Sequence, residues 1–338
     1  MPFRIKVSLA IIALLVLLVV FLPLVVRIPP PANTLSLEAA VAAVDRPDGR
    51  LLDVDGVQLY TTFTPYSGTG EAPLAFVLLH GYASNAFSFD AIREGLAAFG
   101  DVVAFDRPGF GLSSRPQPDD FRGSENPYGP EAQVRQTVDL IDRLGLERVV
   151  LVGDNSGGVL ALEVALQHPE LVAGLVLVAT PAYLLSEGGG APRWLLATPQ
   201  LRRVGPMLMR QVAGPPGEQM YTGAWFDGTK ATDAQREARM IGTTVAGWDQ
   251  GLWQVTLAGP PVSLEGRVQQ VRAPALVVAG AAAGSVPLSE SERLAEELQD
   301  PTLVKLEACG DLPQEECPGQ LLGLVADWLT GAGGLIAR

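Results

Sequence analysis

The chain has 338 residues, of which 48% are hydrophobic, and its formal net charge is −13 at pH 7. This length suits one large domain with an insertion or two small domains, and it allows a sizeable core. The acidity argues against a nucleic-acid partner, because binding to phosphates requires a basic surface.

An uncharged apolar stretch near the N-terminus is the first predicted element. Residues 7–26 carry no charge and are long enough to cross a bilayer as a helix. Arg4 and Lys6 precede the stretch and Arg27 follows it, and positive charge favours the cytoplasmic side. We therefore expect an uncleaved signal anchor, with the rest of the chain on the extracytoplasmic side. The alternative is a secreted form, whereas the lack of a following Cys excludes a lipoprotein.

Strand patterns and helix patterns alternate along the rest of the chain. A hairpin is expected over residues 51–63. Buried strands are predicted at residues 74–79, 102–105, 149–152, 175–178, 275–279 and 303–306, and helices at residues 35–44, 91–99, 130–144, 159–166 and 321–329. This alternation predicts an α/β fold with a doubly wound, mostly parallel sheet.

One segment interrupts the alternation. Residues 182–266 lack a strand pattern, contain several Pro and Gly interruptions, and carry Trp225, Trp248 and Trp253. This composition predicts an inserted helical cap whose large side chains either line a pocket or form the core of the cap itself. The expected organisation is a cytoplasmic tip with an anchor at residues 1–27, a spacer at 28–45, the cap at 182–266, and a core in two parts, 46–181 and 267–338.

A tight turn between a strand and a helix is the feature around which the chain is organised. The strand ends at Gly153 and the helix pattern starts at Gly157, so Asn155 is predicted at the tip. This pattern is typical of a nucleophile elbow, whose glycines permit a strained tip and a close approach of the two backbones. An amide cannot be activated as a hydroxyl can. A shift of one residue would put Ser156 at the tip, but it would place Asp154 where the first glycine belongs.

Together the motifs resemble the α/β-hydrolase fold, and in detail its membrane-anchored, esterase-like members. The resemblance covers about residues 50–330. It rests on the His80-Gly81 turn, the D-R-P-G-F-G turn at residues 106–111, the elbow, and the loops at residues 280–287 and 310–318. It implies acyl transfer by a Ser–His–acid triad, here replaced by Asn155 at the nucleophile position, Ala283 at the acid position and Asp311 at the histidine position.

The two histidines offer no base in the position that the resemblance requires. They are His80 and His168, whereas the base of this fold follows the elbow and lies near the C-terminus. His168 ends the helix after the elbow and is expected to be structural.

The resemblance also implies an oxyanion hole made by the backbone N–H groups of Tyr82 and Ser156. It assigns His80, Gly81, Gly153 and Gly157 to the support of this site. No metal or cofactor is expected.

Three hypotheses follow from the replaced triad. The first is a non-catalytic, membrane-tethered protein that binds a small molecule or a protein partner. The second is a hydrolase or lyase with altered chemistry that uses Asp311, His80 or Ser156, and the third is an inactivated variant of an esterase. Because an ionised Asp311 would repel an anion, the expected ligand is neutral and apolar or ester-like. Cys309 and Cys317 form either a disulfide or two free thiols.

Overall fold

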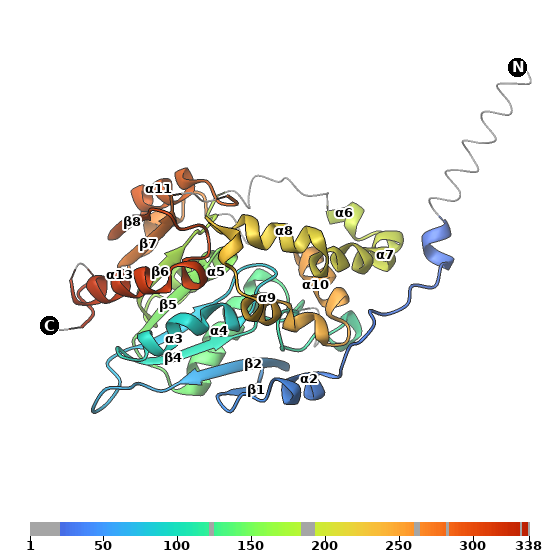
Figure 1. Cartoon of the computed structure of the whole chain (residues 1–338), viewed down its shortest axis with the longest axis horizontal. Helices are drawn as coiled ribbons and strands as arrows, with labels where there is room; N and C mark the ends of the chain where they lie inside the picture. Colours follow the sequence, from blue (N-terminus) through green and yellow to red (C-terminus); the bar gives the residue numbers. More distant parts are fainter. Residues whose placement is uncertain are drawn as a thin grey trace, which may run out of the picture.

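A single eight-stranded sheet forms the centre of the molecule (Figure 1). The structure, a computed structural model, describes residues 21–121, 125–183, 193–259, 264–281, 284–331 and 333–336. The strands are β1 (Gly49–Val54), β2 (Val57–Thr64), β3 (Ala75–Leu79), β4 (Asp101–Phe105), β5 (Val149–Asp154), β6 (Val172–Val178), β7 (Ala275–Gly280) and β8 (Pro301–Leu306).

The strand order is β1-β2-β4-β3-β5-β6-β7-β8. The first two strands form an antiparallel hairpin, β2 joins β4 antiparallel, and every pair from β4 to β8 is parallel. The predicted α/β fold with a mostly parallel sheet is confirmed.

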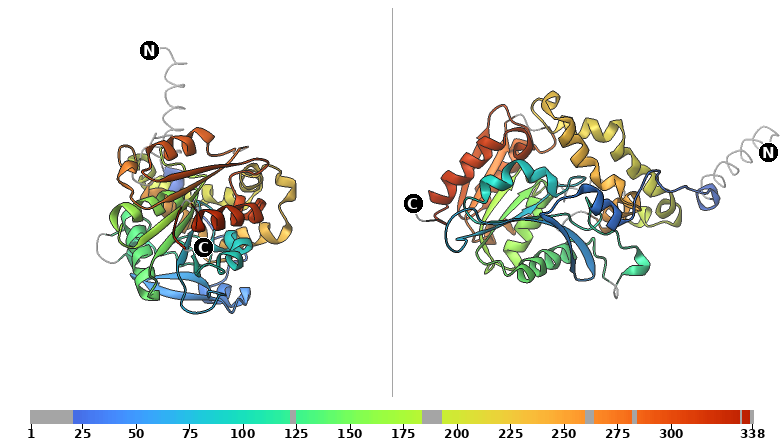
Figure 2. Two further views of the ribbon diagram at one scale, coloured as in Figure 1. Left: turned by 90° about the vertical axis from the view of Figure 1, so that its left-hand side faces the viewer. Right: turned by 60° about the horizontal axis from the view of Figure 1, so that its bottom comes forward.

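Both faces of the sheet are buried, because side chains alternate along each strand and helices cover both sides. In β3, Val77 and Leu79 belong to one core cluster, whereas Phe76 and Leu78 belong to the other. Helices on the two faces are visible in Figure 2. The first cluster packs against α4 (Pro130–Leu144), α5 (Ser156–Gln167) and α11 (Leu288–Glu297), and the second against α3 (Asp90–Leu96) and α13 (Pro318–Thr330).

In the described part of the segment between β6 and β7, five helices make up the cap. They are α6 (Arg193–Leu196), α7 (Pro199–Met209), α8 (Pro215–Gly223), α9 (Asp233–Met240) and α10 (Trp248–Ala258). Trp225 packs with Tyr221, and Trp248 packs with Phe110, the aromatic residue of the D-R-P-G-F-G turn. Trp253 is also buried. The tryptophans therefore form the core of the cap and its contact with the sheet domain.

Short segments complete the fold. They are α2 (Leu37–Val44), α12 (Pro313–Glu316) and the 3₁₀ turns Ala86–Phe89, Pro118–Asp120, Arg210–Ala213, Gly228–Lys230, Ile241–Thr244 and Val268–Gln270. Residues 21–25 are helical and lie at the cap end of the molecule, opposite the C-terminus (Figures 1 and 2). From residue 21 onward, no helix among the described residues has both the length and the hydropathy needed to span a bilayer. Most of the predicted anchor, residues 7–20, lies outside the described residues.

Candidate functional site

Asn155 lies at the tip of the turn between β5 and α5. Its backbone has φ 50° and ψ −119°, a conformation that is strained for a residue with a side chain. A Cβ on Gly157 would overlap the carbonyl oxygen of Leu79 in β3, and a Cβ on Gly153 would overlap the backbone of Gly158. The structure therefore has the geometry of an elbow, with Asn155 at the position expected from the favoured register.

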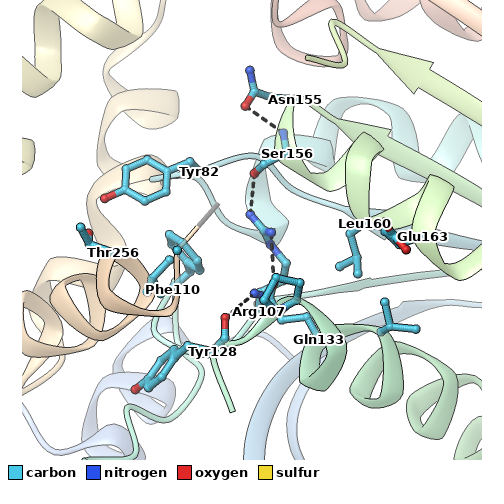
Figure 3. Close-up of a pocket in the computed structure, with 14 residues that line it drawn as sticks. Tyr82, Arg107, Phe110, Tyr128, Gln133, Asn155, Ser156, Leu160, Glu163 and Thr256 are labelled. Carbon is cyan, nitrogen blue, oxygen red and sulfur yellow. Dashed lines mark hydrogen bonds between the residues drawn. The ribbon is translucent and has the colours of Figure 1, made fainter. Parts of the chain in front are cut away.

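The amide of Asn155 is turned toward the start of α5. Its Oδ1 atom accepts a hydrogen bond from the N–H of Ser156 at 2.8 Å (Figure 3). One of the two expected oxyanion donors is thus occupied by the Asn155 side chain. The His80-Gly81 turn packs on the elbow, since a Cβ on Gly81 would lie 3.1 Å from the Cβ of Asn155. The joint role of Tyr82 and Ser156 as an oxyanion hole stays a prediction.

His80 is fixed as a neutral side chain within the protein. Its Nδ1 atom is 2.7 Å from the carbonyl oxygen of Gly81, and its Nε2 atom accepts the N–H of Arg107 at 2.9 Å. This pattern requires the proton on Nδ1. Burial and the nearby Arg107 charge hold the pKa of His80 well below its usual value. His80 therefore positions two turns, whereas His168 lies 3.6 Å from Glu170 at the end of α5.

Asp311 is tied to the loop that follows β7. Its Oδ2 atom accepts hydrogen bonds from the N–H of Ser285 at 2.8 Å and from the Ser285 hydroxyl. Its own N–H donates to the carbonyl of Ala224 in the cap at 2.7 Å. The structure thus brings together the two loops expected to carry the acid and the base. Ala283 itself lies outside the described residues. Ser285 was not singled out from the sequence.

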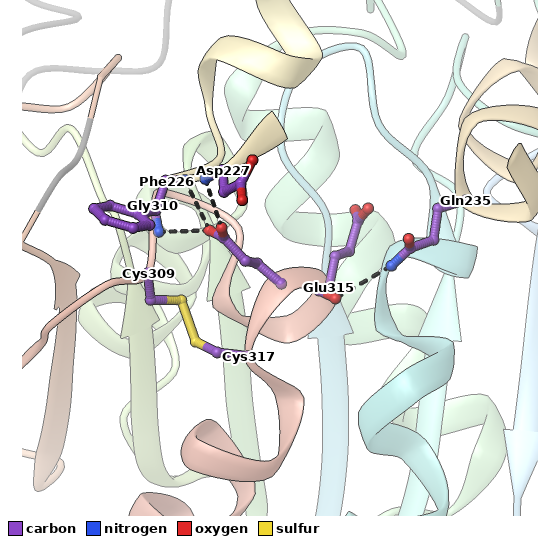
Figure 4. The surroundings of a disulfide bond; sticks show 8 residues. Phe226, Asp227, Gln235, Cys309, Gly310, Glu315 and Cys317 are labelled. Carbon is purple, nitrogen blue, oxygen red and sulfur yellow. Dashed lines mark hydrogen bonds between the residues drawn. A yellow bond between two sulfur atoms is a disulfide. The ribbon is translucent and has the colours of Figure 1, made fainter. Parts of the chain in front are cut away.

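A disulfide closes the loop that carries Asp311. Cys309 and Cys317 are joined, which settles the alternative left open by the sequence (Figure 4). Within this loop the Glu316 carboxylate accepts N–H groups from Gly310 at 2.7 Å and from Phe226 at 2.9 Å. The same carboxylate therefore links the loop to the segment after α8 in the cap.

Two carboxyl groups lie near the elbow, the buried one of Asp154 and the half-buried one of Glu315. The pKa of Asp154 is raised to about 8, mainly by burial and secondly by the charge of Glu315. Burial likewise raises the pKa of Glu315, whose carboxylate accepts hydrogen bonds from Ser88 and Tyr221. Neither carboxyl group lines the cavity beside Asn155. The raised pKa values of these two groups therefore do not act on a ligand in that cavity.

A cavity of about 340 Å³ opens beside Asn155 (Figure 3). Its lining comes from the sheet domain and from α10 of the cap, and consists of Tyr82, Arg107, Phe110, Tyr128, Pro130, Gln133, Val134, Asn155, Ser156, Leu160, Glu163, Val255, Thr256 and Gly259. Asp311 is not part of this lining, so the reason for expecting a neutral ligand does not hold in the structure. The cap tryptophans are also outside it.

Arg107 is one of several lining residues that were not predicted from the sequence. Arg107 follows β4 in the D-R-P-G-F-G turn. Its position at the carboxyl end of a strand could have identified it from the sequence, because ligands bind at this edge of α/β sheets. Its guanidinium donates to Ser156 Oγ at 3.0 Å and to Gln133 Oε1 at 3.2 Å. Burial lowers the pKa of Arg107 to about 10, which leaves the side chain cationic at pH 7.

Comparison with known proteins agrees with this geometry. A family model described as alpha/beta hydrolase fold matches residues 75–318. The uncharacterized hydrolase YugF of Bacillus subtilis is 33% identical over 40% of this chain, and the match spans only 45% of YugF. Epoxide hydrolase A of Mycobacterium tuberculosis is 28% identical over 84% of this chain and 98% of its own length.

Solved structures show the same architecture. A crystal structure described as a membrane phospholipase A, a novel bacterial virulence factor, is 21% identical with a TM-score of 0.65. It covers 98% of this chain and 99% of its own. The family match, the sheet order and the elbow show that the chain belongs to the α/β-hydrolase fold family.

Proposed function

We propose that the protein is a membrane-tethered, non-catalytic member of this family that binds a largely apolar small molecule. The elbow carries the proposal. Asn155 stands at the nucleophile position and its amide accepts the Ser156 N–H, while a cavity of about 340 Å³ persists beside it. Cavities of this size are typical of small-molecule sites.

The groups around the elbow support the absence of acyl-transfer chemistry. A serine nucleophile needs a general base within hydrogen-bonding reach. The Ser156 hydroxyl accepts a hydrogen bond from Arg107, a cation that cannot act as a base. Asp311 is engaged by Ser285, and both ring nitrogens of His80 lie within hydrogen-bonding distance of backbone groups.

The cap surface supports the membrane tether. Arg203 donates to the carbonyl of Val26 at 3.0 Å and Arg210 to that of Pro29 at 2.7 Å, so the end of the apolar stretch is held on α7 and the turn after it. Trp194 in α6 and Leu208 in α7 are 73% and 50% exposed. Exposed apolar side chains beside an anchor are suited to contact with a lipid surface. A domain outside the cytoplasm is also consistent with the disulfide.

The proposal is tested by restoring the triad in the full-length protein. We expect wild type to show at most the roughly 10³–10⁴-fold acceleration over water that binding alone provides, and no labelling by a fluorophosphonate. The triple variant Asn155→Ser, Ala283→Asp, Asp311→His is expected to gain p-nitrophenyl ester turnover and labelling. The single variant Asn155→Ser is the control, because it lacks a base.

The second hypothesis, altered chemistry, makes a different prediction for the same assay. Stoichiometric fluorophosphonate labelling of wild type at Ser156 would contradict the non-catalytic proposal. So would wild-type ester turnover that is lost in the variant Asp311→Asn.

A further inference from the structure

Arg107 is a buried cation in the wall of the cavity. Its side chain is only 6% exposed. Its two hydrogen-bond acceptors, Ser156 Oγ and Gln133 Oε1, are both neutral. The guanidinium carbon also lies 5.1 Å from the centre of the Phe110 ring. These contacts orient the guanidinium without pairing it directly with a carboxylate.

No carboxylate of the described residues lies within ion-pair distance of Arg107. Its Nε atom is buried and has no acceptor within the described part of the chain. Buried charges in proteins are ordinarily paired or bound to a ligand. A guanidinium has five N–H donors, and the contacts with Ser156 and Gln133 use two of them.

The other acids near the cavity do not serve as the partner. Glu163, which belongs to the lining, is already bound by Arg267, with one Nη atom 2.9 Å from Glu163 Oε2. The charge of Asp154 favours the cationic form of Arg107, but Asp154 is outside the lining, and burial raises its pKa to about 8. The net charge that the cavity presents to a ligand is therefore positive at its Arg107 end.

The polar and apolar parts of the lining are separated. Arg107, Ser156 and Gln133 form one hydrogen-bonded group, as Figure 3 shows. The remaining walls include the apolar side chains of Phe110, Val134, Leu160 and Val255. A ligand that matches both parts has one anionic end and an apolar body.

We propose that the cavity binds an organic monocarboxylate, with the carboxylate at the Arg107 guanidinium and the apolar body against these walls. The inference rests on the proposed function as a binding protein and names its ligand class. It replaces the neutral ligand expected from the sequence, because Asp311 does not line the cavity and Arg107 does. A planar guanidinium is suited to this role, since it pairs with a carboxylate through two parallel hydrogen bonds.

The test compares an acid with its own ester. Full-length protein in lipid nanodiscs is titrated calorimetrically at pH 7 with 4-phenylbutanoate and with methyl 4-phenylbutanoate, and empty nanodiscs serve as the reference. We expect wild type to bind the carboxylate at least about tenfold more tightly than the ester, as a hydrogen bond to a charged group implies. This preference is expected to weaken as salt increases.

Variants of Arg107 test whether this side chain causes the preference for the carboxylate over the ester. Arg107→Gln is expected to weaken carboxylate binding about 10- to 100-fold and ester binding less than threefold. Arg107→Lys is expected to retain part of the preference for the carboxylate, because lysine keeps the positive charge but lacks the planar guanidinium that donates two parallel hydrogen bonds. Arg143→Gln is the matched control, since it removes the same charge from an exposed position of α4 and is expected to change neither affinity.

The outcomes separate this inference from the proposed function. Wild type that binds the ester as tightly as the carboxylate overturns the inference and leaves the binding function in place. Wild type that binds neither probe contradicts both. Equal losses of both ligands in Arg107→Gln would assign Arg107 to support of the elbow alone. If that variant does not fold, the wild-type comparison of acid and ester still decides the question.

Discussion

Asp154 shows how one residue of the elbow links folding to pH. The side chain is 1% exposed, and its Oδ1 atom has no hydrogen-bond partner among the described residues. Burial raises its pKa from the ordinary 3.8 to about 8. Between these two values the unfolded chain has released a proton that the folded chain keeps, so stability falls as pH rises. Ionisation of Asp154 therefore opposes folding at neutral and alkaline pH.

The variant Asp154→Asn tests this effect. We expect it to raise the urea midpoint of unfolding more at pH 8 than at pH 5, because the amide cannot ionise. Some pH dependence is expected to remain, since burial also raises the pKa of Glu315. Asp119→Asn, at an exposed position, is the control and is expected to show no such difference. An equal shift of the Asp154→Asn midpoint at both pH values would rule out this account.

At the level of elements, the elbow depends on how closely α5 approaches the sheet. Gly157, the second residue of α5, lies directly against β3, where a Cβ would overlap the backbone carbonyl of Leu79. Backbone atoms of a central strand cannot move aside as a flexible side chain can. Gly323, in α13, is different, because a Cβ there would meet nothing within 4 Å.

Two Gly→Ala variants compare a glycine packed against the sheet with a glycine that has open space around it. Gly157→Ala is expected to destabilise the protein by about 1–3 kcal/mol or more, through overpacking. Gly323→Ala is expected to stabilise it by roughly 0.5–1 kcal/mol, because alanine loses less backbone entropy in a helix. The measurement is the free energy of unfolding in urea. Effects of the same sign and size at the two positions would show that packing against β3 does not constrain the elbow.

At the scale of the whole molecule, residues 21–26, the described end of the predicted anchor, lie at the same end as the cap. The segment after the apolar stretch is bound by Arg203 and Arg210, and the exposed Trp194 lies in the neighbouring helix α6. With this arrangement, insertion of the anchor would bring the cap close to the bilayer surface. The tether is thus expected to orient the molecule as well as to retain it.

The anchor is tested by charge insertion. Full-length wild type is expected in the membrane fraction, resistant to extraction by high salt. The double variant Leu14→Arg, Leu18→Arg is expected in the supernatant, because each arginine at the centre of a spanning helix costs about 2.5–3.5 kcal/mol. Leu14→Ala, Leu18→Ala is the matched control and is expected to stay with the membrane. Soluble wild type, or a mature chain that starts after residue 27, would refute the anchor.

The sequence by itself determined the fold and the position of Asn155 in the elbow. Strands that are buried on both faces are continuous apolar runs in the sequence. Helices such as residues 130–144 show a helical periodicity of apolar residues and are followed by a glycine. Both kinds of element can therefore be predicted from the local sequence. The elbow is equally local, because Gly153, Asn155 and Gly157 lie within five residues of one another. The absence of a late histidine needs no geometry at all.

Only the tertiary structure decided which side chains face the cavity. Arg107 meets Ser156, which is 49 positions away, and Asp311 meets Ser285, which is 26 positions away. Such pairs depend on the order of strands in the sheet and on side-chain direction, which local periodicity does not encode. The choice between a Cys309–Cys317 disulfide and two free thiols also depends on tertiary structure, because the fold must bring the two side chains within bonding distance. Asp311 therefore lies outside the cavity lining, whereas Arg107, in a motif already recognised from the sequence, belongs to it.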